Sequence, residues 1–416
     1  MIELEKTSRG TYSTNFFSIF INGDFQPNLN QLGKKDLGTF AHEYLHYIQN
    51  LTTIYGLRNG IFHFQLLKEV KEFLKSTSKI DLPLKLNFLS DRIKKGSELF
   101  KVMDGNKGID VGNFTSYDYK LIKRNIGGDN YELVELSFYT ANSKPTRVIF
   151  GATCVKESMC HYFQSLFDDK INHDLIPYKS AEFLVKKICP EILTDKRKII
   201  SLLLASLSSI NPGRSFLDNL EKSKMYPDLN GFDLYHRLMK SNTINFSGKN
   251  YSCREFLKES LKKYELWVNQ NIDRELIYIK KLIENIHFNI EEGITPLVQL
   301  LYSDKLTEIE KLTFLTENYG IPSIRVQDGT LYFPMDKTKK EPSIDIVEFM
   351  AQKTVLDRLF ETYSCQTTCS MVHICQQSEE EFIEEGCYNN QWDRKKQCKF
   401  TIVSDNWGLK NKIIKK

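Results

Sequence analysis

Apolar and polar residues alternate with the period of a helix along most of the chain. Over residues 39 to about 54, apolar side chains recur at intervals of three and four, which predicts a long amphipathic helix. The same period predicts helices over residues 61 to about 74 and near 89–102. It continues almost unbroken through residues 181–301, and a last helix is predicted over residues 346 to about 360.

Strand signals are confined to a few short stretches. The apolar run 16–21 ends at an Asn-Gly-Asp turn and predicts a strand. Residues 131–139 alternate apolar with polar, and residues 147–150 predict a second strand before a helix from 151 to about 167. An Asp-Gly pair between apolar runs predicts a hairpin over 324–333. The chain is therefore predicted to be a predominantly helical α+β protein.

The bulk composition is that of an ordinary globular protein. Of the 416 residues, 41% are hydrophobic and 26% are charged, and the formal net charge is only +4, so neither disorder nor general nucleic-acid binding is expected. The start lacks the layout of a secretory signal, and the longest apolar run, 199–207, is shorter than the ~20 residues that cross a bilayer. We expect a soluble, cytoplasmic protein without membrane contact, in which the nine cysteines are thiols or metal ligands.

The candidate chemistry lies in the sequence His42-Glu43-Tyr44-Leu45-His46. Residues four apart share one face of a helix, so His42 and His46 can direct both imidazoles at one metal ion. Glu43 lies beside the first histidine, where its carboxylate can take a proton from a metal-activated water. A chance match on an ordinary helix is the alternative. Glu43 is the only charged residue between Thr39 and Ile48, however, and a carboxylate in such apolar surroundings needs a partner or a task.

This stretch resembles the signature of the zincin metallopeptidases. A threonine stands three residues before the first histidine, the variable positions are uncharged, and a hydrophobic residue ends the motif. The wider run from His42 to Gly56, with Gln49, is also similar to a group of poorly characterised bacterial proteins. The resemblance implies a peptidase with a catalytic zinc ion. The third histidine of the metzincins is absent, because Gln49 and Thr52 follow the motif.

The resemblance to the gluzincin subclass implies a third ligand on a downstream helix. Glu157 is the best candidate, although it lies further from the motif than in the best-known gluzincins. His161, one turn later, is predicted to support catalysis as an outer partner or by binding substrate, and His161 or Cys154 are the fallback ligands. Tyr139, His161 and Tyr162 are candidates for stabilising the oxyanion, whereas His63 is expected to be a packed or surface residue.

Cysteines are concentrated near the end of the chain. Five of the nine fall there, with His373 among them: Cys365, Cys369, Cys375, Cys387 and Cys398. Such density predicts a second, structural zinc ion or, as the less favoured option, an iron–sulfur cluster, although the spacing matches no known zinc finger. The alternative is a set of small buried hydrophobic residues. Basic runs nearby are offset by acidic ones, so nucleic-acid contact is not favoured.

The leading interpretation is a zinc peptidase made of three regions. Residues 1–175 are predicted to be a zincin-like catalytic region, 176–345 a mainly helical region, and 346–416 a helix with a cysteine-rich metal-binding tail. The substrate is expected to be a protein or peptide, with narrow specificity or regulation by a partner, as in a toxin or defence effector. The alternatives are a metal-stabilised interaction or nucleic-acid-binding protein, and a hydrolase of non-peptide amides.

Overall fold

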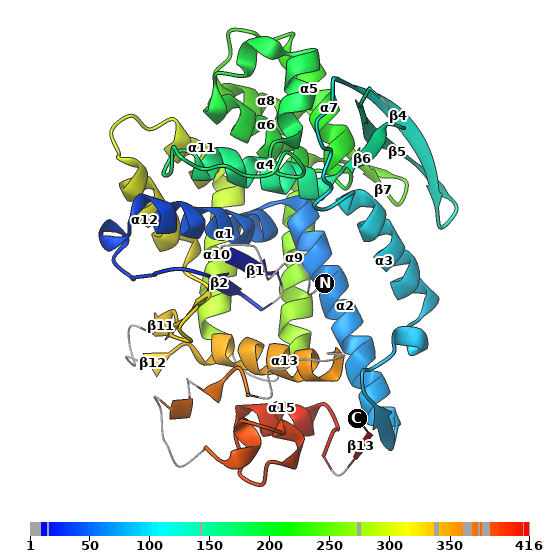
Figure 1. Cartoon of the computed structure of the whole chain (residues 1–416), viewed down its shortest axis with the longest axis vertical. Coiled ribbons are helices and arrows are strands. Elements are labelled where there is room, and N and C mark those ends of the chain that lie inside the picture. Colours follow the sequence, from blue (N-terminus) through cyan, green and yellow to red (C-terminus); the bar gives the residue numbers. More distant parts are fainter. Residues whose placement is uncertain are drawn as a thin grey trace.

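Helices make up most of this chain, and several small sheets lie between them (Figure 1). The computed structural model describes residues 10–14, 16–141, 144–272, 276–336, 341–360, 368–372, 375–376, 383–410 and 412–415. The predicted α+β class with predominant helix is confirmed. One large hydrophobic cluster connects residues from Phe17 to Leu409.

Helix α1 (Lys34–Thr52) lies in the middle of the molecule and is buried on nearly every side. It begins five residues earlier than predicted, with Asp36 in its first turn, where a negative charge favours the helix dipole. A helix that is buried on nearly every side must be enclosed by other elements. Accordingly, the hydroxyl group of Tyr44 donates to the carbonyl of Gly320 at 2.7 Å, and that of Tyr47 donates to the carbonyl of Tyr319 at 2.7 Å.

A sharp turn at Thr53 separates α1 from α2 (Ile54–Ser76). The Thr53 side chain accepts a hydrogen bond from the backbone N–H of Gly56 and so caps α2. A Cβ atom at Gly56 would lie 2.4 Å from the Gln49 carbonyl oxygen, so only glycine permits this close approach. The predicted second helix therefore begins earlier than residue 61. Helix α3 (Asp91–Asp104) agrees with its prediction within two residues.

A four-stranded sheet joins two strands near the N-terminus to two strands more than 300 residues later, in the order β1-β2-β9-β10. Its strands are β1 (Gly10–Ser13), β2 (Ser18–Ile21), β9 (Ser323–Val326) and β10 (Leu331–Tyr332). The predicted hairpin over 324–333 is confirmed, and β9 also pairs in parallel with β2.

A three-stranded antiparallel sheet, with the strand order β4-β5-β6, comes directly before helix α4 in the chain. It comprises β4 (Ser116–Ile126), β5 (Asp129–Tyr139) and β6 (Thr146–Phe150). The strands over 131–139 and 147–150 are confirmed. Immediately after β6, helix α4 (Ala152–Gln164) begins and packs beside α1 (Figure 1). This succession places α4 against the helix that carries the histidine motif.

The region from residue 180 onward is mainly helical, as predicted. Its helices are α5 (Ser180–Ile188), α6 (Lys196–Leu207), α7 (Pro212–Ser223), α8 (Gly231–Ser241), α9 (Cys253–Asn271), α10 (Ile277–Glu292), α11 (Pro296–Leu301) and α12 (Glu308–Tyr319). The helical prediction is wrong over residues 243–252. There the hairpin of β7 (Thr243–Phe246) and β8 (Lys249–Ser252) turns at residues 247 and 248, both of which have a positive φ.

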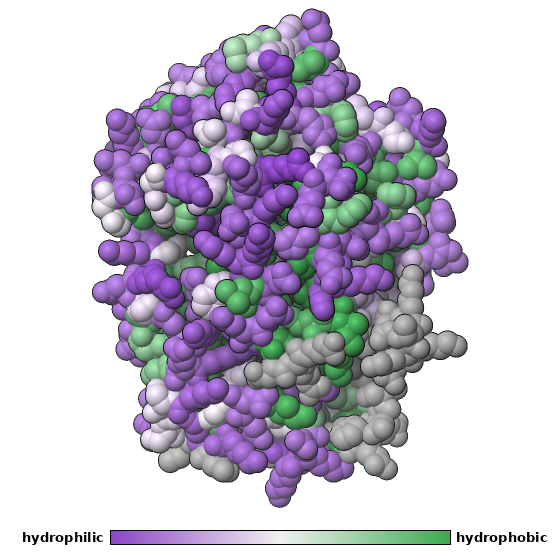
Figure 2. All heavy atoms as spheres, turned by 180° about the vertical axis from the view of Figure 1, so that it is seen from behind, coloured by the Kyte–Doolittle hydropathy of each residue, from purple (hydrophilic) through white to green (hydrophobic). Residues whose placement is uncertain are grey.

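The C-terminal part packs along one end of the molecule. Helix α13 (Ile344–Phe360) crosses below α9 and α10, and α15 (Lys399–Asn406) lies against α13 (Figure 1). Strand β13 (Ile413–Lys415) pairs in parallel with β3 (Lys79–Asp81), directly after α2. Hydrophilic side chains cover most of the face shown in Figure 2. Among the described helices, none is both long enough and apolar enough to span a membrane.

Candidate metal centre

Helices α1 and α4 bring three candidate metal ligands together. The Nε2 atoms of His42 and His46 lie 3.2 Å and 3.3 Å from the same atom, Oε2 of Glu157. The two imidazole rings are 5.0 Å apart and nearly perpendicular. The spacing of His42 and His46 on one helical face, and the placement of Glu157 beside them, agree with the sequence-based predictions.

The three side chains are shielded from solvent, and the two imidazoles stabilise the charged form of Glu157. The His42 side chain is 7% exposed and that of Glu157 is 21% exposed. Burial alone would raise the pKa of the Glu157 carboxyl, but the two imidazoles hold this pKa well below its usual value. Glu157 therefore faces the histidines as a carboxylate. The alternative, that it faces solvent and pairs with Lys156 or His161, is wrong.

Two glutamines hold the other ring nitrogens of the histidine pair. Oε1 of Gln164 lies 2.9 Å from Nδ1 of His42, and Oε1 of Gln49 lies 3.0 Å from Nδ1 of His46. An amide oxygen only accepts, so each Nδ1 must carry a hydrogen, and each Nε2 is the ring nitrogen that faces Glu157. Gln164 is not predicted from the sequence, whereas Gln49 is part of the resemblance.

Cys160 offers a second way to complete a donor group. His42, His46 and Cys160 each have a ligand atom within 4.8 Å of the others, so these residues form a possible metal-binding triad. The Cys160 sulfur lies 3.5 Å from Nδ1 of His46, on the opposite side of the ring from Glu157. Cys160 is one turn after Glu157 on α4 and is fully buried. The sequence-based prediction names Cys154 as the fallback cysteine instead.

Glu43 is buried beside the histidine pair. Its pKa is raised, mainly by burial, although the imidazoles of His42 and His46 oppose this effect. The first residue of β1, Gly10, covers it so closely that a Cβ atom there would lie 2.6 Å from Cγ of Glu43. A carboxyl group with a raised pKa next to a candidate metal centre is suited to accept and release a proton.

A cluster of His161, His173 and Tyr178 borders the centre. Nδ1 of His161 lies 3.2 Å from Nδ1 of His173, and the rings of His173 and His42 are 5.5 Å apart. Burial lowers the pKa of His161 to about 4 and that of His173 to about 3, so both are neutral near pH 7. The Tyr178 ring stacks 4.3 Å from His173. His173 and Tyr178 were missed from the sequence because they lie in an irregular segment between α4 and α5.

Other predicted site residues lie elsewhere. The thiol of Cys154 is engaged by the Ser180 side chain and the Gly151 backbone, and Tyr162 is buried in the core. Tyr139 ends strand β5 and is 42% exposed. His63 lies on α2, where burial lowers its pKa to about 4, in agreement with the prediction of a packed residue.

The structure describes four of the five cysteines that are predicted to bind metal in the tail. Cys369 and Cys387 are buried, and Cys375 and Cys398 are half-buried. Cys365 and His373 lie outside the described residues.

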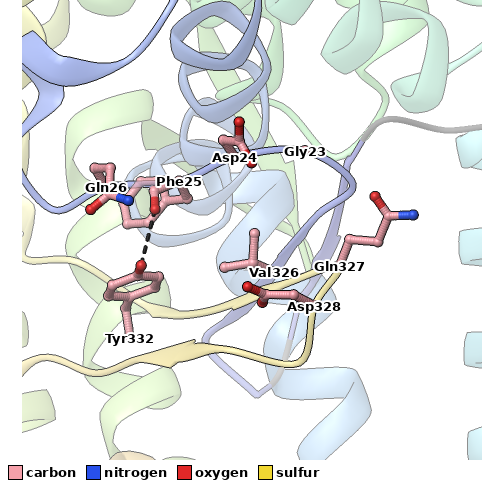
Figure 3. A pocket seen from close by; sticks show the side chains of 8 residues that line it. All are labelled: Gly23, Asp24, Phe25, Gln26, Val326, Gln327, Asp328 and Tyr332. Carbon is pink, nitrogen blue, oxygen red and sulfur yellow. Dashed lines mark hydrogen bonds between the residues drawn. The ribbon is translucent and has the colours of Figure 1, made fainter.

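A cavity of about 470 Å³ opens next to the candidate centre. His173 lines it together with the loop before β4 and the segment before α5: Ile109, Asp110, Leu175 and Lys179. A second cavity, of about 300 Å³, lies between the segment after β2 and the β9–β10 hairpin (Figure 3). There the Tyr332 hydroxyl group donates to the Phe25 carbonyl at 3.0 Å. The second cavity contains none of the predicted site residues.

No family model, no curated protein and no solved structure matches this chain.

Proposed function

We propose that this chain is a zinc-dependent peptidase in which His42, His46 and Glu157 bind the metal. The observation that carries the proposal is the pair of distances, 3.2 Å and 3.3 Å, between Oε2 of Glu157 and the two Nε2 atoms. A tetrahedral ion with bonds of about 2.0–2.1 Å separates its nitrogen and oxygen ligands by about 3.3 Å. The Nε2 atom of each histidine therefore already has the separation from Oε2 of Glu157 that zinc requires.

Glu157 is a better third ligand than Cys160. A metal bound to Nε2 of both histidines leaves each Nδ1–H donating to its glutamine, so both hydrogen bonds are kept. A metal shared by Cys160 and His46 would have to bind Nδ1 and displace the bond to Gln49, because the sulfur lies on that side of the ring. A His-His-Glu ligand set is also the one that the gluzincin resemblance implies.

The chemistry divides between the metal and the surrounding side chains. Zinc bound at this centre supplies a Lewis acid that polarises a carbonyl group and acidifies water. Glu43 takes the proton of the attacking water and passes it to the leaving nitrogen. The neutral imidazoles of His161 and His173 and the phenol of Tyr178 are the nearby groups that can donate hydrogen bonds to the developing oxyanion.

The position of strand β1 supports an extended peptide as the substrate. It is an edge strand that pairs with β2 among the described residues, and its first residue lies over Glu43. A peptide that added to this edge would run past the proposed base. Burial of His42 and Glu43 restricts access to the centre, which supports a narrow substrate range or an activation step, as expected for a toxin or defence effector.

The test compares wild-type protein with Glu43→Gln. We expect cleavage of a substrate, detected as new protein N-termini in cells that express the chain, to fall by about 10²–10⁴-fold because the general base is lost. Bound zinc should stay unchanged, because Glu43 is not a ligand.

Glu72→Gln, on the exposed surface of α2, is the matched control and should cleave like the wild type. Identical N-termini in cells with wild-type protein and with Glu43→Gln would overturn the assignment as a peptidase. A metal-stabilised binding protein or a hydrolase of non-peptide amides would give that result.

A further inference from the structure

The C-terminal tail gathers four thiols from separate segments. The backbone N–H of Cys369 donates to the carbonyl of Cys387 at 2.6 Å, which joins two of these segments directly. Cys375 follows on the turn after Cys369, and Cys398 is the N-cap residue of α15. Burial is the main cause that raises the pKa of Cys369 to about 11, and the three other cysteines act in the same direction, so all four thiols lie within electrostatic range.

Hydrogen-bond donors surround three of the four sulfur atoms. The backbone N–H of Met371 donates to the sulfur of Cys369, and Nη1 of Arg394 donates to the sulfur of Cys387. The Thr401 hydroxyl group lies 3.8 Å from the sulfur of Cys398. Donors aimed at sulfur stabilise thiolates, and metal-bound thiolates are held in this way. The arrangement is not expected of cysteines that serve only as small hydrophobic residues.

A buried positive charge accompanies the cluster. The Arg394 side chain is only 2% exposed, and its Nε atom lies 3.3 Å from a carboxylate oxygen of Glu384. Burying a guanidinium group is costly unless negative charge surrounds it. Four thiolates around a divalent ion carry a net charge of about −2, which Arg394 would offset in part.

We propose that Cys369, Cys375, Cys387 and Cys398 bind one structural zinc ion through four thiolates. This site is separate from the centre on α1 and α4 and does not depend on the proposed peptidase activity.

Zinc binding would draw the tail together. Among the described residues, the donor group at His42, His46 and Cys160 is the one with three ligand atoms inside 4.8 Å, so the tail sulfurs are more widely spaced. Zinc–sulfur bonds of about 2.3 Å would bring them to about 3.8 Å from one another. The tail is also fixed to the rest of the fold, because β13 pairs with β3 and the Lys71 ammonium group lies over the Trp407 ring. The ion would therefore stabilise the packing of the tail against α2 and α13.

Metal analysis of the full-length protein tests the proposal. Cys387→Ser should contain one zinc ion fewer than the wild type, whereas Glu157→Ala should keep the tail ion. Cys189→Ser is the matched control, because this buried cysteine follows α5 at the opposite end of the molecule, and its zinc content should equal that of the wild type (Figure 1).

A second measurement needs no change in the tail. Metal-free Glu157→Ala, titrated with Co²⁺ alone, should develop the sulfur-to-cobalt charge-transfer and ligand-field bands of a tetrahedral thiolate site. A mercurial thiol reagent should then release the ion. Absence of these bands, an unchanged zinc content in Cys387→Ser, or stoichiometric iron and inorganic sulfide in the wild-type protein would each overturn the proposal.

Discussion

Each of the two candidate metal-binding imidazoles is held by a neutral amide. Gln164 and Gln49 accept from Nδ1 of His42 and His46, and this leaves the two Nε2 lone pairs for the metal. A carboxylate at either position would add negative charge and make the imidazole a stronger donor. With neutral partners, the negative charge of the centre is concentrated on Glu157 and Glu43, where the proposed binding and proton transfer take place.

The residues of this centre that sequence reasoning predicted all lie on regular helices. His42, Glu43 and His46 follow from the period of α1, and Glu157 follows from the helical period around it together with the gluzincin resemblance. His173 and Tyr178 lie in an irregular loop, which has no period from which their direction can be predicted. Cys160 and Gln164 are on α4, but the sequence does not reveal how that helix is rotated against α1.

The two candidate donor groups make opposite predictions for single substitutions. If Glu157 is the third ligand, Glu157→Ala should lose the zinc ion of this centre, because two histidines alone do not hold a catalytic zinc. Cys160→Ser should retain that ion, because the serine hydroxyl group replaces only a contact on the Nδ1 side of His46. Zinc content after exposure to a competing chelator measures both effects.

Both variants retain the tail cysteines, so any zinc bound at the tail adds to the zinc content that is measured. Combining each substitution with Cys387→Ser isolates the centre on α1 and α4. Loss of the ion in Cys160→Ser, with retention in Glu157→Ala, would show that the cysteine is the ligand and would remove the likeness to a gluzincin site.

At the scale of elements, the close crossing of α1 and α4 forms the centre. A Cβ atom at Gly38 would lie 3.0 Å from Cβ of Asp168 and 3.2 Å from Cγ of Gln164. Glycine at this position in α1 costs about 0.5–1 kcal/mol relative to alanine, since it is a poor helix former. The cost is offset because the end of α4 can come close enough for Gln164 to reach His42.

Replacing Gly38 with leucine should therefore damage both stability and metal binding. Overpacking at such a contact costs about 1–3 kcal/mol of unfolding free energy. Displacement of Gln164 should weaken zinc binding by about 10–100-fold, the usual effect of losing an outer partner of a metal ligand. Urea denaturation of the metal-free protein and competition with a chelator measure the two effects separately.

Gly38→Ala is the matched control. Its gain in helix propensity opposes its smaller steric cost, so its stability should stay close to that of the wild type. If Gly38→Leu had the same urea midpoint and the same zinc affinity as the wild type, the packing of α1 on α4 would not be what positions Gln164.

The elements that sequence reasoning missed are those whose pairing comes from distant contacts. Strand β4 is largely exposed and carries Lys120, Lys123 and Arg124, so its apolar signal is weak, and it is fixed by pairing along the whole length of β5. The β7–β8 hairpin lies between long helices and contains few buried residues. The parallel pairing of β2 with β9 joins segments about 300 residues apart, and no local pattern encodes that register.

At the scale of the whole molecule, the proposed catalytic helix depends on the C-terminal third of the chain. The hydroxyl groups of Tyr44 and Tyr47 donate to backbone carbonyls at residues 315, 319 and 320, and Phe17 packs 5.0 Å from Phe349. Strand β2 also loses its partner β9 if the chain ends early. Each buried hydrogen bond left unsatisfied costs about 1–3 kcal/mol, and a domain has only about 5–15 kcal/mol of stability in total.

A fragment of residues 1–175 should consequently fail to fold on its own, although the sequence predicts a catalytic region with those bounds. We expect it to lack near-ultraviolet circular dichroism, to be digested rapidly by added protease and to bind zinc without the affinity of the full chain. The full-length protein with Tyr47→Phe is the graded control, because it loses a single hydrogen bond and should remain folded with about 1–3 kcal/mol less stability. A fragment with native-like dichroism and full zinc affinity would instead establish residues 1–175 as an autonomous domain. The contacts from α12, β9 and α13 would then contribute little to the metal centre, and the burial of α1 would need another source within the fragment itself.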